Sequence, residues 1–147
     1  MYKRLLVPVD GSELSERAMH ASVLLAHQLG AAITGFVAEP MQPAMADARP
    51  HSMWADDVRE HDARTAAHAR QVLSKFEAVA KEAGVSFTGF HDQVPRVDNG
   101  IIQAAESQGC DMIVMVTHGR GAFGEFLFGS HTKAVLAGSK LPLLVLH

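Results

Sequence analysis

The segment between residues 116 and 130 contains the most specific chemical signal in this sequence. It reads VTHGRGAFGEFLFGS and follows the apolar stretch MIVMV at 112–116. Glycines let backbone amides approach a ligand because they have no Cβ. Near Gly129 and Ser130 a helix is expected to begin, and its free amides and positive dipole end favour an anion. With the charge of Arg120 beside them, these groups predict a site for a polyphosphate. The alternative is a tight surface turn in which Ser130 only caps the helix.

Two better-known phosphate motifs do not explain this segment. Gly119-x-Gly121-x-x-Gly124 matches the dinucleotide fingerprint letter for letter. That fingerprint follows the first strand of its sheet, however, and an acidic residue should come about 20 residues later. Here that region reads Ser139-Lys140-Leu141, and little chain remains. A Walker loop is excluded because no Gly-Lys-Ser or Gly-Lys-Thr occurs in the chain.

Alternating strands and helices must position this segment. Nearly unbroken apolar runs predict buried strands, and apolar residues at helical spacing predict helices between them. We expect strands at 3–9, 32–38, 85–94, 112–116 and 141–146, and helices at about 14–29, 55–83, 98–108 and 130–138. The expected inner face of the first helix is formed by Leu14, Ala18, Ala21, Leu25 and Leu29, and that of the second by Ala69, Val72, Leu73, Phe76, Val79, Ala80 and Ala83. Prolines 40, 43 and 50 predict an irregular loop before the second helix.

The order βαβαβαβαβ predicts an α/β fold with a doubly wound, five-stranded parallel sheet and helices on both faces. In such a sheet the ligand crevice lies outside the carboxyl ends of the strands, where the winding reverses. Asp10 follows the first strand, and Thr117 to Gly119 follow the fourth. We therefore expect these residues at the floor of the crevice.

The whole chain resembles the universal stress protein family. Members that bind nucleotides carry Gly, two residues, Gly, nine residues, then Gly-Ser or Gly-Thr, and this chain has Gly119, nine residues, then Gly129-Ser130. LLVPVDGS at the start, DMIVM before the loop and LPLLVL at the end are similar to the family's first, fourth and fifth strands. The resemblance implies a single domain over 1–147, an adenine nucleotide alpha hydrolase-like fold and the strand order 3-2-1-4-5.

The resemblance also implies a ligand, ATP with Mg²⁺, and the residues around it. Asp10 stands where the family places an aspartate beside the ribose and adenine pocket, which Pro8 and Val9 line, and Ala38 stands where the backbone meets the adenine edge. The residues expected around the phosphates are Thr117, His118, Gly119, Arg120, Gly129, Ser130 and Thr132. Independently, an aspartate at a strand's carboxyl end suits a ribose hydroxyl or a magnesium ion. Asp10 also suits a purely structural role as a turn and helix-cap residue.

Val116 departs from the family pattern, because it occupies the position of the first motif glycine. A branched side chain there adds bulk and restricts φ. The sequence therefore supports two functions: a stress-response regulator that binds ATP, at best a very slow ATPase, and a dimeric interaction module of the same family without nucleotide. ATP hydrolysis needs a base or water-positioning group, for which only Asp10, Glu125 and His118 are available.

Composition excludes other classes of partner. The 147 residues include 13 Lys and Arg against 16 Asp and Glu, a net charge of −3, so there is no basic field for nucleic acid. No apolar run is long enough to cross a membrane. The lone Cys110 cannot form an intrachain bridge and favours a reducing, cytoplasmic compartment; we expect it to be a buried, small apolar residue.

Two further patterns concern surfaces. Asp57, His61 and His68 lie at spacings that line one face of the second helix, but no further ligand completes a metal shell, so we interpret them as a solvated face. The last strand, 141–146, would be an apolar edge if it ends the sheet. Together with the family resemblance, this edge predicts a homodimer through that strand.

Overall fold

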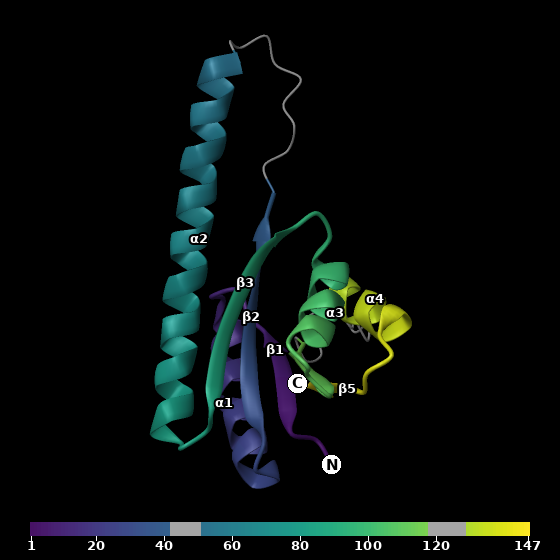
Figure 1. Ribbon diagram of the computed structural model, residues 1–147. Coiled ribbons are helices and arrows are strands. Elements are labelled where there is room, and N and C mark those ends of the chain that lie inside the picture. The colour runs from purple at the N-terminus through teal and green to yellow at the C-terminus, as the bar shows by residue number, and fades with distance from the viewer. Residues whose placement is uncertain (42–50, 118–128) are drawn as a thin grey trace, which may run out of the picture.

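The computed structural model describes residues 1–41, 51–117 and 129–147, in which strands and helices alternate along the chain (Figure 1). The strands are β1 (Arg4–Pro8), β2 (Ala32–Pro40), β3 (Phe87–Val94), β4 (Met112–Val116) and β5 (Leu143–Leu146). The helices are α1 (Glu13–Leu29), α2 (His51–Glu82), α3 (Val97–Ser107) and α4 (Ser130–Gly138). The predicted order of elements is confirmed. None of these helices is long and apolar enough to cross a membrane.

The sheet is parallel, and its strand order is β3-β2-β1-β4-β5, as the family resemblance implied. Helices α1 and α2 cover one face and α3 and α4 the other (Figure 1). Each face has its own apolar core. Leu5 and Val7 of β1 point into the α1/α2 core, and Leu6 between them points into the α3/α4 core. This alternation is the period of two expected of a strand that is covered on both faces.

The winding reverses between β1 and β4, and their pairing there is short. The β1–β2 ladder pairs every residue from Arg4 to Pro8, whereas the β1–β4 ladder pairs only Leu5 and Leu6 with Met112 and Ile113. The carboxyl ends of β1 and β4 are therefore not joined by ladder hydrogen bonds. This is the place where open α/β sheets bind ligands.

Helix α1 has the predicted ends but a different buried face. Ser12 caps its start by accepting a hydrogen bond from the Ser15 amide at 3.2 Å, and Gly30 ends it with φ +64°. Of the five apolar residues expected inside, only Ala18 is fully buried, and Leu29 is exposed. The buried face is formed by Ser15, Ala18, Met19, Ser22, Val23 and Ala26. The prediction was wrong because it followed the leucines, whereas the stripe that packs on the sheet lies beside them and includes Met19, Val23 and two buried serines.

Several element boundaries also differ from the prediction. Helix α2 begins at His51, not near Ala55, because no proline or glycine interrupts the sequence from there to Gly84. Strand β2 continues to Pro40, which pairs with Val94; a strand's last residue tolerates the missing amide donor. Strands β3 and β5 begin two residues later than expected, at Phe87 and Leu143. Pro142, just before β5, offers only its carbonyl, which accepts a hydrogen bond from the Ile113 amide.

The predicted inner face of α2 is confirmed. Phe76 is fully buried and contacts Phe87 of β3, with ring centroids 4.9 Å apart. On the other face Phe90 stacks on Phe36 of β2 at 5.6 Å. Cys110 is a buried free thiol whose pKa is raised by burial, which confirms its expected apolar role.

Candidate functional site

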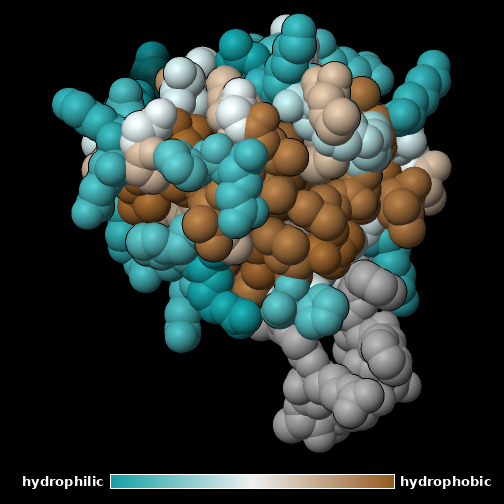
Figure 2. All heavy atoms as spheres, turned by 90° about the horizontal axis from the view of Figure 1, so that it is seen from below, coloured by the Kyte–Doolittle hydropathy of each residue, from teal (hydrophilic) through white to brown (hydrophobic). Residues whose placement is uncertain are grey.

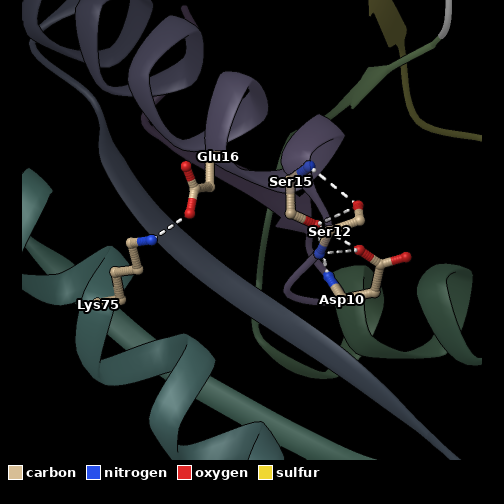
Figure 3. A network of polar contacts seen from close by, with 5 residues as sticks. All are labelled: Asp10, Ser12, Ser15, Glu16 and Lys75. Atoms are coloured by element: carbon tan, nitrogen blue, oxygen red, sulfur yellow. Dashed lines mark hydrogen bonds and ion pairs between the residues drawn. The ribbon is translucent and has the colours of Figure 1, made fainter.

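The candidate site lies at the carboxyl ends of β1 and β4, where the winding of the sheet predicts a ligand crevice, and the turn after β1 contains several described hydrogen bonds. There the Ser15 hydroxyl donates to Asp10 Oδ1 at 2.6 Å, and the Ser12 amide donates to the same oxygen at 3.0 Å. The Asp10 amide donates to Ser15 Oγ at 2.7 Å. Figure 3 shows this network at the first turn of α1. The turn thus orients the Asp10 side chain before any ligand arrives.

The hydrogen bonds also keep Asp10 ionised. Burial by itself would raise the pKa of this carboxyl, but hydrogen bonds from Ser12 and Ser15 outweigh it and hold the pKa below its usual value. The second carboxylate oxygen, Oδ2, has no hydrogen-bond partner among the described residues and points away from the turn in Figure 3. Asp10 therefore presents one free anionic oxygen that can accept from a hydroxyl or ligate a hard cation.

The start of α4 forms the other side of the crevice. Because β4 and β5 are parallel, the helix between them runs back along the sheet, so its first residues lie at the carboxyl ends of the strands. Gly129 is the N-cap residue, and no side chain of the described residues caps the helix. Gly129 and Ser130 are exposed, Thr132 is buried, and the Gly129 carbonyl accepts from the Lys133 amide at 3.2 Å. Uncapped amides at a helix N-terminus are donors for an anion.

Other residues predicted in the site lie at the ends of the same strands. Pro8 is the last residue of β1, and the Val9 amide donates to the Phe36 carbonyl at 2.8 Å. The Thr117 amide after β4 donates to the Leu146 carbonyl at 2.8 Å. The structure therefore brings Pro8, Val9, Asp10, Thr117 and the start of α4 to one edge of the sheet. Predicted residues His118, Gly119 and Arg120 lie outside the described residues, as do Gly121, Gly124 and Glu125.

Ala38 and Val116 lie on opposite faces of the sheet. Ala38, near the end of β2, packs against the core under α3 and α4. Val116, the last residue of β4, packs against the core under α1 and α2 together with Leu144 and Leu146. Helix α4 covers the face opposite to the Val116 side chain, since its Val135 belongs to the other core.

Three polar residues of α2 contact the site, and the sequence did not predict this. His61 Nε2 lies 3.3 Å from the Pro40 carbonyl and His68 Nε2 lies 3.1 Å from the Asp10 carbonyl. Between them, Thr65 Oγ lies 3.2 Å from Glu39 Oε2. The interpretation of this helix face as merely solvated is therefore incomplete. The missed signal is the spacing i, i+4, i+7 of polar residues opposite two strand ends. Among the described residues, no cluster of three His, Cys, Asp or Glu is placed to hold a metal.

Comparisons with known proteins agree with the fold. The family model described as "Universal stress protein family" matches residues 1–147. A universal stress protein from Thermus aquaticus is 30% identical, over 99% of this chain and 98% of its own length. The crystal structure of a universal stress protein family member from Burkholderia pseudomallei is 25% identical with a TM-score of 0.73, covering 99% of this chain and 96% of that one.

Two further solved structures of similar fold contain adenine nucleotides. One is a universal stress protein in complex with cAMP, 22% identical with a TM-score of 0.72, which covers 99% of this chain and 97% of that one. The other is the universal stress protein from Archaeoglobus fulgidus in complex with dAMP, 16% identical with a TM-score of 0.70, which covers 99% and 98%. At these identities the likeness concerns the fold.

Proposed function

This chain belongs to the universal stress protein family, and we propose that it binds an adenine nucleotide, ATP with Mg²⁺, in the crevice between the carboxyl ends of β1 and β4. In this proposal it acts as a stress-response regulator that is either occupied by nucleotide or empty. Chemistry on the nucleotide is at best slow hydrolysis.

The observation that carries the proposal is the state of Asp10. Its Oδ1 is fully used by the protein and its Oδ2 is free among the described residues. A pre-oriented carboxylate with one free oxygen suits a ribose hydroxyl or a magnesium ion. Its position at the winding reversal of the sheet, where open α/β sheets bind ligands, places this free oxygen where a ligand is expected.

The start of α4 supplies the complementary donors. The amides after Gly129, which no described side chain caps, and the Ser130 hydroxyl favour phosphate oxygens. Gly129 and Ser130 are exposed among the described residues, which suits a site that receives a ligand from solvent. The cAMP and dAMP complexes of the two structures of similar fold support an adenine nucleotide as the ligand class.

Binding of ATP by this site is tested by equilibrium dialysis of the full chain with Mg²⁺ present. We expect uptake below millimolar ATP, and we expect Ser130→Glu or Gly129→Glu to abolish it, because each places a negative charge among the amides. Ala137→Glu adds the same charge to an exposed position in the last turn of α4 and should leave uptake unchanged. No uptake by the unaltered chain at millimolar ATP would remove the proposal.

The second candidate function is an interaction module that binds no nucleotide. It is favoured by the presence of Val116 at the position of the family's first motif glycine. The Val116 side chain packs toward α1 and α2, however, on the face opposite to α4, and this argues against obstruction of the amides at the start of α4. The variant Val116→Gly distinguishes the two candidates. A large gain of ATP affinity favours the interaction module for the natural chain, whereas an unchanged affinity favours nucleotide binding.

We also propose that two copies of the chain pair through β5. This strand forms the edge of the sheet beside β4, and all four of its residues are half-buried. An apolar edge invites pairing. Independently, Figure 2 shows hydrophobic side chains gathered in the middle of the face seen from below and bordered by hydrophilic ones, and such a face also favours association. Light scattering should give a dimer at micromolar concentration, and Leu144→Glu should give a monomer; a monomeric natural chain contradicts the pairing.

A further inference from the structure

The polar stripe of α2, formed by His61, Thr65 and His68, reaches the ends of both β1 and β2. His68 Nε2–H donates to the Asp10 carbonyl at 3.1 Å, and His61 Nε2–H donates to the Pro40 carbonyl at 3.3 Å. Both carbonyls lie at or beyond the last ladder positions of their strands. Each histidine therefore binds main chain where the sheet itself provides little restraint.

The turn after β1 lies directly against α2. Gly11 has φ +85°, and a Cβ at this position would lie 3.0 Å from Val72 Cγ2 and 3.1 Å from His68 Cε1. The same turn carries the Asp10 carboxylate and the Ser12 cap. The His68 hydrogen bond thus fixes the turn from one side, while Ser15 fixes it from the other.

The end of β2 is attached to α2 through a buried carboxylate. The Glu39 side chain is 6% exposed and pairs with His91 Nδ1 of β3. Thr65 Oγ lies 3.2 Å from Glu39 Oε2 and 3.1 Å from the Asp62 carbonyl of its own helix, so its single proton has two acceptors. Because side chains alternate along a strand, Glu39 faces α2 while its neighbour Ala38 faces the opposite core.

We propose that His61, Thr65 and His68 are positioning residues that fix the β1–β2 side of the nucleotide site by holding the Asp10 turn and the end of β2 on one helix. The proposal rests on nucleotide binding at this site as argued above. Their described contacts all lie on the β1–β2 side, so the stripe is expected to orient the ribose and adenine side of the ligand and not the phosphates. Lost hydrogen bonds of this kind change an equilibrium by roughly three- to tenfold.

The first test needs no ligand. In the ligand-free full chain, hydrogen exchange of the Asp10 and Ser12 amides should be about three- to tenfold faster in His68→Ala, because the turn opens more often. The amides of the α2 core around Phe76 should be unaffected. His68→Gln retains a donor at the ε position and should restore slow exchange. Arg70→Ala, which removes an exposed side chain two residues after His68 on the same helix, is the matched control. Equal exchange in His68→Ala and Arg70→Ala overturns the proposal.

The second test measures binding of ATP and of adenosine, which has no phosphates. His68→Ala and His61→Ala should weaken both ligands by about the same three- to tenfold factor, and the glutamine variants should restore affinity to within about twofold. Unchanged affinity for both ligands overturns the positioning role. If the natural chain takes up neither ligand, the proposed function fails on its own, and the exchange test still decides whether α2 holds the turn.

Discussion

The two sides of the crevice are built differently. On the β1–β2 side, the ends of the two strands pack against α1 and α2. There Ser15 and His68 form hydrogen bonds with Asp10, and Thr65 forms one with Glu39. On the β4 side, α4 begins at exposed Gly129 with no cap from a described side chain, and β5 next to it contains no fully buried residue. One side holds its polar groups in place by internal hydrogen bonds and presents a single free oxygen, Asp10 Oδ2, whereas the other offers the amides at a helix start.

We expect this difference to give the two sides different roles in ligand binding. A side whose hydrogen bonds are satisfied is rigid and orients what it presents, here the free Oδ2 of Asp10. A side with unpaired amides gains most from a ligand that brings acceptors. Substitutions on the α2 side should therefore change stability as well as binding, whereas those at the start of α4 should change binding with little effect on stability.

The largest difference is expected from the core residues. Phe76→Ala should lower the free energy of unfolding by about 3–5 kcal/mol, because it empties a fully buried site under β2 and β3. Leu136→Ala on α4, where the side chain is 65% exposed, should change it by less than about 0.5 kcal/mol. Denaturant unfolding of both variants measures the contrast. Similar losses would contradict the burial of Phe76 and the exposure of Leu136.

The buried pair at the end of β2 should give the next largest effect. His91→Ala leaves the Glu39 carboxylate without its imidazole partner and should cost about 1–3 kcal/mol. His91→Asn keeps a donor at the δ position and should recover most of this loss. Chemical denaturation at pH 7 compares the two, and equal losses would mean that the hydrogen bond to Glu39 contributes nothing.

Two glycines, one on each side, should respond differently to a side chain. Gly11→Ala should cost about 1–2 kcal/mol, because φ is +85° there and the new Cβ would crowd Val72 and His68. Gly129→Ser should cost nothing measurable, since space is open and serine is a favoured N-cap residue. Thermal unfolding measures the stability of each variant against the natural chain. A Gly11→Ala protein as stable as the natural chain would contradict the close contact of this turn with α2.

The smallest effect concerns acid stability through Asp10. Its folded pKa lies below the usual value, so the unfolded chain binds more protons in acid and stability falls as pH decreases. The contribution is fully present above the unfolded value of about 3.9 and is lost as pH falls through the folded pKa. Asp10→Asn should therefore be less stable than the natural chain at neutral pH, with the difference vanishing in strong acid. A difference that is constant down to pH 2 contradicts the assignment.

The fold was predictable because its signals are local and strong. Apolar runs such as MIVMV and LLVL identify strands, and their alternation with helices indicates a parallel sheet. The strand order came from the family resemblance and is confirmed. Asp10 was also predictable, because an aspartate followed by Gly-Ser after a buried strand marks both a turn and a helix start.

The features that were not predicted depend on tertiary contacts, which leave only a weak signal in the local sequence. The buried face of α1 is formed by Met19, Val23 and small or hydroxyl-bearing residues, not by its leucines. The roles of His61 and His68 depend on carbonyls 21 and 58 residues away in the sequence. Glu39 was not predicted as a buried residue because its partner, His91, comes from the neighbouring strand 52 residues later.

A titration of the isotope-labelled full chain with Mg²⁺ and ATP, followed by amide chemical shifts, tests the central claim most directly. If both sides form one site, the amides of Asp10 to Ser12 and of Ser130 to Thr132 shift together and saturate with one dissociation constant below the millimolar range. Shifts confined to one side, different dissociation constants for the two, or no shifts at millimolar ATP would contradict a nucleotide crevice between β1 and β4.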